Sequence, residues 1–326
     1  MHLEDVNIEG FKSFSEETNM SFQPGIGVII GNNGVGKSNI LDAIVWAMGD
    51  NDLGRIRCYA RDELFFAGSK DYPPASGIRV ELNLKGDQEK DTTGVRLARE
   101  MNKEGQNRYY IQGKACDWSM YKQNLDRYHL GHALKTIVRQ EQINDLLQLN
   151  PLARVQSIGA LLGMGKHVDI ITYLQKKVDP IFKRYMSYLM PKAHVALLTP
   201  AFDGKFGIDV EVMLKGNRVR RAHQLSGGEK AVTSLALKLA LFRGLESPFY
   251  LLDEVEPSLD YTNHKSMQAF LKDVASDKQL IMITHLRSTM ELANTLHGVR
   301  TRWDGSSFMK FYFVMEERLL RLYKCC

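Results

Sequence analysis

The chain has 326 residues, of which 44% are hydrophobic and 25% are charged, and these proportions exclude a mainly disordered protein. Its formal net charge of +5 permits an anionic partner such as nucleic acid without requiring one. The first residues lack a secretory pattern, no apolar run could span a membrane, and the four cysteines lack metal-site spacing. We therefore expect a cytoplasmic protein without membrane contact.

The first part of the chain is predicted to contain strands that flank one glycine-rich stretch. Alternating or continuous apolar patterns predict strands at residues 1–14, 25–31, 78–85, 95–101 and 108–113. Helical spacing occurs at residues 39–48 and 117–128, whereas residues 51–77 are predicted to form a long loop with short elements. The glycine-rich stretch at 31–38 thus lies between a strand and a helix.

The second part of the chain begins with a charged helical segment, residues 166–190, which Pro180 is expected to interrupt and Pro191 to close. Strands and helices then alternate. The predicted strands are 193–199, 206–214, 248–254, 279–285, 296–302 and 307–315, and the predicted helices follow Ser226 and cover about 261–275. This alternation predicts an α/β fold in which helices cover a sheet.

The glycine-rich stretch has the spacing of a phosphate-binding loop. Gly31, Gly36, Lys37 and Ser38 fit G-x-x-x-x-G-K-[ST], in the strand-to-helix context that this motif requires. Glycines let the backbone wrap a phosphate chain, the lysine reaches the β- and γ-phosphates, and the serine holds Mg²⁺. We therefore predict ATP and Mg²⁺ as cofactors. The loop residues expected at the nucleotide are Asn32, Asn33, Gly34, Gly36, Lys37, Ser38 and Asn39.

Four further residues are candidates for the chemistry. Asp253 and Glu254 follow an apolar strand, where the first would complete the magnesium shell with Ser38 and the second would polarise a water. Gln140, in a polar turn, is a candidate for contacting both Mg²⁺ and the attacking water. His285 ends an apolar strand and could reach the γ-phosphate. Taken alone, a glutamine in such a turn is usually only solvated, and a histidine at a strand end usually has only a structural role.

A polar step precedes the helix after Ser226. Ser226 is a good N-cap and Glu229 completes a capping box, but capping does not require the two glycines Gly227 and Gly228. Glycines allow another surface to approach closely, and free amides at a helix N-terminus attract anions. The pattern indicates an anion site, and the residues alone leave open whose anion it binds.

The order of these segments resembles that of ABC-type ATPases and, more narrowly, the ATPase head of structural maintenance of chromosomes (SMC) proteins. The similar segments are "GFKSF" (10–14), "GVGKSNILDAI" (34–44), "FFAGS" (65–69), "LSGGEKAVTSLAL" (225–237), "LLDEVEPSLDYTN" (251–263) and "ITHLRSTMELANTLHGV" (283–299). The resemblance implies a two-lobed α/β head with a mixed or parallel sheet, an antiparallel β lobe and a short helical insertion. The implied segments are residues 1–165, 166–192 and 193–326.

The resemblance also implies how the residues act. Two heads would enclose ATP, with Ser226, Gly227 and Gly228 of one head on the γ-phosphate held by the other. Asp260 would lie in the loop that couples the two sites. Arg57 lies where the family has an arginine loop, but Ile-Arg-Cys-Tyr replaces the usual Leu-Arg-Gly-Gly, so Arg55 is an alternative.

The implied partners are a second SMC head, a kleisin subunit and DNA bound without sequence preference, with no membrane. The DNA candidates are Arg55, Arg61, Lys70, Arg96, Arg99, Lys103 and Arg108. Only about 85 residues separate Gln140 from Leu225, where the family has long coiled-coil arms. Either the arms have been deleted or the chain is a compact relative. The alternatives are a RecF-like or break-repair ATPase and a transporter subunit.

Overall fold

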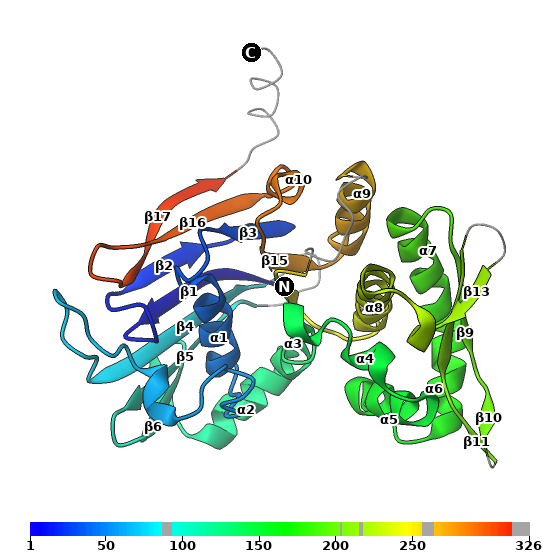
Figure 1. Ribbon diagram of the computed structural model, residues 1–326. Coiled ribbons are helices and arrows are strands. Elements are labelled where there is room, and N and C mark those ends of the chain that lie inside the picture. The colour runs from blue at the N-terminus through cyan, green and yellow to red at the C-terminus, as the bar shows by residue number, and fades with distance from the viewer. Residues whose placement is uncertain (87–92, 203, 215–217, 256–263, 315–326) are drawn as a thin grey trace, which may run out of the picture. The chain divides into compact units, whose positions relative to one another are not determined.

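The computed structural model describes residues 1–86, 93–202, 204–214, 218–255 and 264–314 (Figure 1). The chain forms two compact units. The first combines Met1–Ile137, Ser247–Asp253 and Ala275–Cys326, and the second combines Val138–Glu246 and Glu254–Val274. The units thus interleave along the chain, whereas the sequence predicted three consecutive segments. Among the described residues, no helix is both long and apolar enough to cross a membrane.

The first unit contains an antiparallel sheet of six strands. In spatial order they are β2 (Thr18–Ser21), β1 (His2–Glu9), β4 (Gly77–Lys85), β5 (Val95–Asn102), β6 (Asn107–Ile111) and β7 (Lys114–Cys116). Every second residue of β4 is buried, from Ile78 to Leu84, which is the alternation expected of a strand with one covered face.

A second, mixed sheet also belongs mainly to this unit. Its order is β17 (Ser307–Val314), β16 (Thr295–Thr301), β3 (Ile26–Ile30), β15 (Gln279–Ile283), β14 (Phe249–Asp253) and β8 (Ile137–Arg139), the strand in which the first unit ends. Strands β16, β3, β15 and β14 are parallel, and β17 is antiparallel to β16. All residues of β14 and β15 are buried, which explains their continuous apolar sequences.

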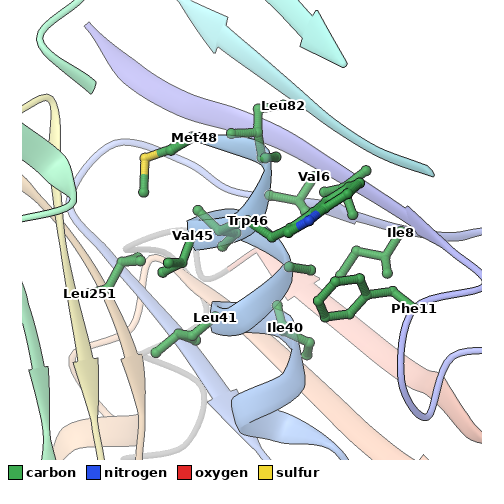
Figure 2. Close-up of a cluster of buried hydrophobic side chains, with 14 of the residues drawn as sticks. Val6, Ile8, Phe11, Ile40, Leu41, Val45, Trp46, Met48, Leu82 and Leu251 are labelled. Carbon is green, nitrogen blue, oxygen red and sulfur yellow. The ribbon is translucent and has the colours of Figure 1, made fainter. Parts of the chain in front are cut away.

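Helix α1 (Lys37–Ala47) lies in the core of this unit. Figure 2 shows it between side chains of β1 and β4 on one side and Leu251 of β14 on the other. The Phe11 and Trp46 rings lie 5.8 Å apart, centroid to centroid. Because α1 is held from several sides, the loop at its N-terminus has a fixed position. The remaining helices of the unit are α2 (Trp118–Arg127), α3 (Leu130–Ala133), α10 (Arg287–Met290) and a 3₁₀ turn at Arg61–Leu64.

The second unit is mostly helical. Its helices are α4 (Asp145–Gln148), α5 (Pro151–Leu162), α6 (His167–Tyr173), α7 (Asp179–Leu189), α8 (Gly227–Phe242) and α9 (His264–Val274), with 3₁₀ turns at Gln140–Gln142 and Ala222–Gln224. An antiparallel sheet has the order β13 (Arg218–Arg221), β12 (Asp209–Leu214) and β9 (His194–Leu198), and a hairpin pairs β10 (Ala201–Phe202) with β11 (Lys205–Phe206).

The regular α-helix is interrupted next to Pro180, as predicted: α6 ends at Tyr173, a π-helical turn covers Leu174–Val178, and α7 begins at Asp179. Pro180 lies in the first turn of α7, where a missing N–H removes no hydrogen bond within that helix. Helix α7 ends at Leu189, before Pro191, as predicted. It packs against α8 and α9.

Candidate nucleotide-binding site

Three parallel strands of the mixed sheet end at the same edge. In the strand register, Asp253 of β14 pairs with Ile283 of β15, which pairs with Ile29 of β3. The glycine-rich loop follows β3, and His285 follows β15 as an exposed residue. The carboxyl edge of an α/β sheet is where such folds bind ligands, so the topology brings the phosphate-binding loop, Asp253 and His285 to one edge.

The phosphate-binding loop has a backbone that its glycines permit. Gly34 and Gly36 have φ angles of +79° and +93°, in the left-handed region that side chains disfavour. A Cβ atom at Gly36 would also lie 2.4 Å from the Ser307 hydroxyl and 2.5 Å from that of Ser13. The Lys37 ammonium donates to the carbonyls of Gly31 (3.0 Å) and Asn32 (2.9 Å). The lysine ammonium therefore lies against the backbone of the loop, close to the place where the backbone N–H groups of such loops bind a phosphate chain.

Two oxygen-bearing side chains meet beside this loop. The Ser38 hydroxyl donates to the Asp253 carboxylate across 3.0 Å, and Asp253 is only 6% exposed. Hydroxyl and carboxylate oxygens are the donors that Mg²⁺ prefers. The pair therefore fits the magnesium site predicted from the sequence.

The segment "GFKSF" supports the helix that follows the loop. Ser13 accepts a hydrogen bond from the Asn39 side chain at 2.8 Å, and the Lys12 ammonium donates to Asp42 at 2.7 Å. Asn39 and Asp42 are three residues apart, so they lie on the same face of α1. The segment was recognised by resemblance without a role, and its contacts assign it one: it fixes the first turns of α1.

Glu254 follows Asp253 directly and has a φ of +48°, unusual for a residue with a side chain. Such a backbone costs free energy and is found mostly at functional sites. Asp260, the predicted coupling residue, lies outside the described residues.

In the second unit, the predicted capping box is confirmed. The Ser226 hydroxyl accepts from the Glu229 N–H at 3.4 Å, and the Glu229 carboxylate accepts from the Ser226 N–H at 2.8 Å. Burial alone would raise the pKa of Glu229, but the Ser226 N–H and the Arg220 guanidinium hold that pKa below its ordinary value. Ser226, Gly227 and Gly228 are all exposed at the start of α8.

Gln140 begins the 3₁₀ turn Gln140–Gln142 and is exposed. Two polar residues of α8 hold this turn: the Ser234 hydroxyl donates to the carbonyl of Ile143, and the Lys238 ammonium to that of Gln142. Sequence reasoning missed both residues. The available signal was that Ser234 and Lys238 are four residues apart, on one face of α8, and that Lys238 is the one charged residue of the apolar run Leu235–Phe242.

The two candidates for the arginine loop have different partners. Arg57 is exposed and bonds to the buried Asp42, whereas Arg55 pairs with Asp50 at 3.2 Å and Asp52 at 3.4 Å.

Arg99 cannot serve as a DNA contact, because it is 2% exposed. Its guanidinium lies 4.3 Å from the Trp46 ring centroid and donates to the Trp46 carbonyl at 2.8 Å. The prediction that Arg99 contacts DNA is therefore wrong: the side chain is buried and caps the C-terminus of α1.

The profile described as "RecF/RecN/SMC N terminal domain" matches residues 2–307 of this sequence. The chain belongs to this family. Chromosome partition protein Smc of Mycobacterium tuberculosis is 31% identical over 170 residues, covering 51% of this chain and 14% of that protein. The Smc of Halothermothrix orenii is 36% identical over 208 residues, covering 56% of this chain and 18% of that protein. The chain therefore corresponds to a small part of the length of these relatives.

Solved structures match nearly the whole chain. One is an Smc head bound to the C-winged helix domain of ScpA, with a TM-score of 0.86 and 28% identity, over 98% of this chain and 100% of that chain. The SMC head domain from Thermotoga maritima has a TM-score of 0.70 and 30% identity, over 97% and 100% of the two chains. The predicted SMC head, with the α/β fold of ABC-type ATPases, is confirmed.

Proposed function

We propose that this SMC head binds ATP with Mg²⁺, associates with a second head around the nucleotide, and hydrolyses it. The observation that carries the proposal is the 3.0 Å hydrogen bond between Ser38 of the phosphate-binding loop and Asp253 at the end of β14. A serine and a buried carboxylate that meet beside a phosphate-binding loop are the magnesium ligands of such ATPases.

Each residue has a distinct part in the proposed reaction. Lys37 binds the phosphate charge, and Ser38 and Asp253 would hold Mg²⁺, which would supply positive charge beside the phosphate oxygens. Glu254 accepts a proton from the attacking water. Gln140 would orient that water and would be a further ligand of Mg²⁺, His285 would contact the terminal phosphate, and Arg57 would stabilise phosphate charge.

The segment Ser226–Gly228, which we call the signature, supports sharing of the site between two heads. Gly227 and Gly228 lie in the first helical turn of α8, where any residue can adopt the backbone. A Cβ atom added at Gly227 would meet nothing within 4 Å. The fold of this chain thus does not explain why the position is glycine, whereas close approach of a second head carrying a phosphate would. Ser226 would then contact the γ-phosphate of the partner, and Asp260 would couple the two sites.

The wider role follows from the relatives. Similar proteins are named chromosome partition proteins, and one similar head was solved bound to a ScpA domain. We infer that the full protein associates with chromosomal DNA in the cytoplasm and binds a kleisin subunit. Its phosphate contacts would be independent of sequence and sensitive to salt. A RecF-like or break-repair role remains the second candidate, because the matched profile also covers RecF and RecN.

Complementation between two inactive variants tests the shared site. Ser226→Arg should block closure on a partner's phosphate, and Lys37→Ile should abolish binding in its own loop. Each variant alone should be inactive. In a mixture, a mixed dimer contains one site with an intact loop and an intact signature, so part of the ATPase activity should return.

ATPase rates and sedimentation of each variant and of the mixture decide the matter. Partial recovery on mixing supports the proposal. If Ser226→Arg alone dimerises and hydrolyses ATP at the parental rate, Ser226 only caps α8, and the shared-site mechanism is wrong for this protein.

A further inference from the structure

Two cations converge on one buried carboxylate behind the phosphate-binding loop. Asp42 is 0% exposed, and its Oδ2 accepts from the Lys12 ammonium at 2.7 Å and from Nη2 of Arg57 at 2.7 Å. Nε of Arg57 donates to the same oxygen at 3.2 Å. A carboxylate that accepts charge-assisted bonds from two sides fixes the positions of both donors.

The backbone at both cations is strained. Lys12 has a φ of +49° and Arg57 a φ of +57°, and both carry long side chains. Non-glycine residues persist in this region only where surrounding contacts impose it. The bonds of Lys12 and Arg57 to Asp42 are contacts that can impose this backbone. Together they fix the orientation of the Arg57 side chain.

Lys12 fixes the chain from which Arg57 projects. Its ammonium also donates to the carbonyl of Ile56, the residue before Arg57, at 2.5 Å. Ile56 and Cys58 are both buried, so the residues on either side of Arg57 are anchored. The Lys12 side chain is 10% exposed and that of Arg57 is 36% exposed. Lys12 can thus continue to neutralise Asp42 when the more exposed Arg57 turns toward another anion.

We propose that Asp42 and Lys12 are positioning residues that aim Arg57 at the nucleotide phosphates. This inference rests on the proposed phosphate role of Arg57. Asp42 lies five residues after Lys37 on α1, about 7.5 Å along the helix axis, so the guanidinium is anchored close to the phosphate-binding loop. Asp42 and Lys12 fix the position of the Arg57 side chain before nucleotide binds, and the strained backbone limits the number of conformations that Arg57 can adopt.

A double-mutant cycle on the full protein tests the inference. The variants are Asp42→Asn, Arg57→Ala and both together, with kcat, KM for ATP and thermal stability measured for each. Arg57→Ala should lower kcat. Asp42→Asn should lower kcat by roughly three- to tenfold when Arg57 is present and by less than about twofold when it is absent. A merely structural role would lower kcat equally in both backgrounds.

Asp50→Asn is the matched control. Asp50 is also a buried carboxylate, and it holds Arg55, two residues before Arg57, at 3.2 Å. Its replacement should leave kcat within about twofold of the parent. If Asp42→Asn fails to fold because Lys12 is left unpaired, Asp42→Asn combined with Lys12→Met removes both buried charges and is used in the same cycle.

The outcomes separate the inference from the function on which it rests. Equal loss of kcat with and without Arg57, or no loss on replacing Asp42, overturns the positioning role and leaves the ATPase proposal intact. Parental kcat for Arg57→Ala refutes the phosphate role of Arg57 and the inference with it. If Asp50→Asn lowers kcat and Asp42→Asn does not, the positioning role of Asp42 is overturned and Arg55, the partner of Asp50, becomes the candidate instead.

Discussion

The Ser38 hydroxyl donates to the Asp253 carboxylate across 3.0 Å, although 215 positions separate the two residues. Ser38 belongs to the first turn of α1, and Asp253 is the last residue of β14. The parallel pairing of β14, β15 and β3 aligns the ends of these strands, so the contact follows from the register of the sheet. Glu254 is the next residue in the chain after Asp253, and it is the subject of the first prediction.

Glu254→Gln should bind ATP normally and hydrolyse it at least about a hundredfold more slowly, because the amide keeps the shape of the side chain but accepts no proton. ATP should then trap a stable dimer. ATPase rates and sedimentation with ATP measure both effects. Glu246→Gln, an exposed glutamate just before β14, is the control. Parental turnover by Glu254→Gln would exclude Glu254 as the proton acceptor.

Lys37→Ile should abolish ATP binding, because the phosphate charge loses the ammonium that the loop holds beside the Gly31 and Asn32 carbonyls. Titration with a fluorescent ATP analogue measures the affinity. Lys272→Ile, which replaces an exposed lysine of α9, should bind like the parent. Unchanged affinity in Lys37→Ile would show that nucleotide, if bound, lies elsewhere.

Lys238→Met should lower kcat several-fold while ATP affinity stays close to the parental value. Burial lowers the pKa of Lys238, and its ammonium holds the carbonyl of Gln142 in the turn that begins at Gln140. Methionine keeps the length of the side chain and removes the donor, so the turn loses an anchor on α8. If the effect passes through Gln140, Lys238→Met should change little in a Gln140→Ala background. Additive losses of kcat would contradict this route.

His297 should make the fold acid-sensitive. It lies buried between Phe22 and Tyr312, with ring centroids 4.6 and 4.9 Å away, and burial lowers its pKa to about 4. Below its ordinary pKa of about 6.5, the unfolded chain binds a proton that the folded chain refuses. Stability should therefore fall between about pH 6.5 and 4, by on the order of 3 kcal/mol from this residue.

Denaturant unfolding of the parent and of His297→Phe across this pH range measures that contribution. The variant should lose less stability on acidification. His194→Phe, at an exposed position of β9, should behave like the parent. Identical pH dependence in His297→Phe and the parent would refute the assignment.

Local patterns determined much of this protein from sequence alone. The phosphate-binding loop and the capping box of Ser226 and Glu229 depend on residues only a few positions apart, so their spacing is readable without the fold. The same holds for the alternating pattern of β4 and the continuous apolar pattern of β14. Each pattern reports the burial of its own element.

Long-range packing decided the rest. Nothing near Arg99 in the sequence indicates that its guanidinium lies over Trp46, and nothing near Lys238 identifies the carbonyl that it holds. Likewise, "GFKSF" was recognisable as a segment, but its lysine acquired a partner only when β1 and α1 packed together and Asp42 became buried. A charged side chain looks alike in sequence whether it faces solvent or a buried partner. The difference lies in desolvation and in the partner that compensates for it, and both come from elements distant in the chain.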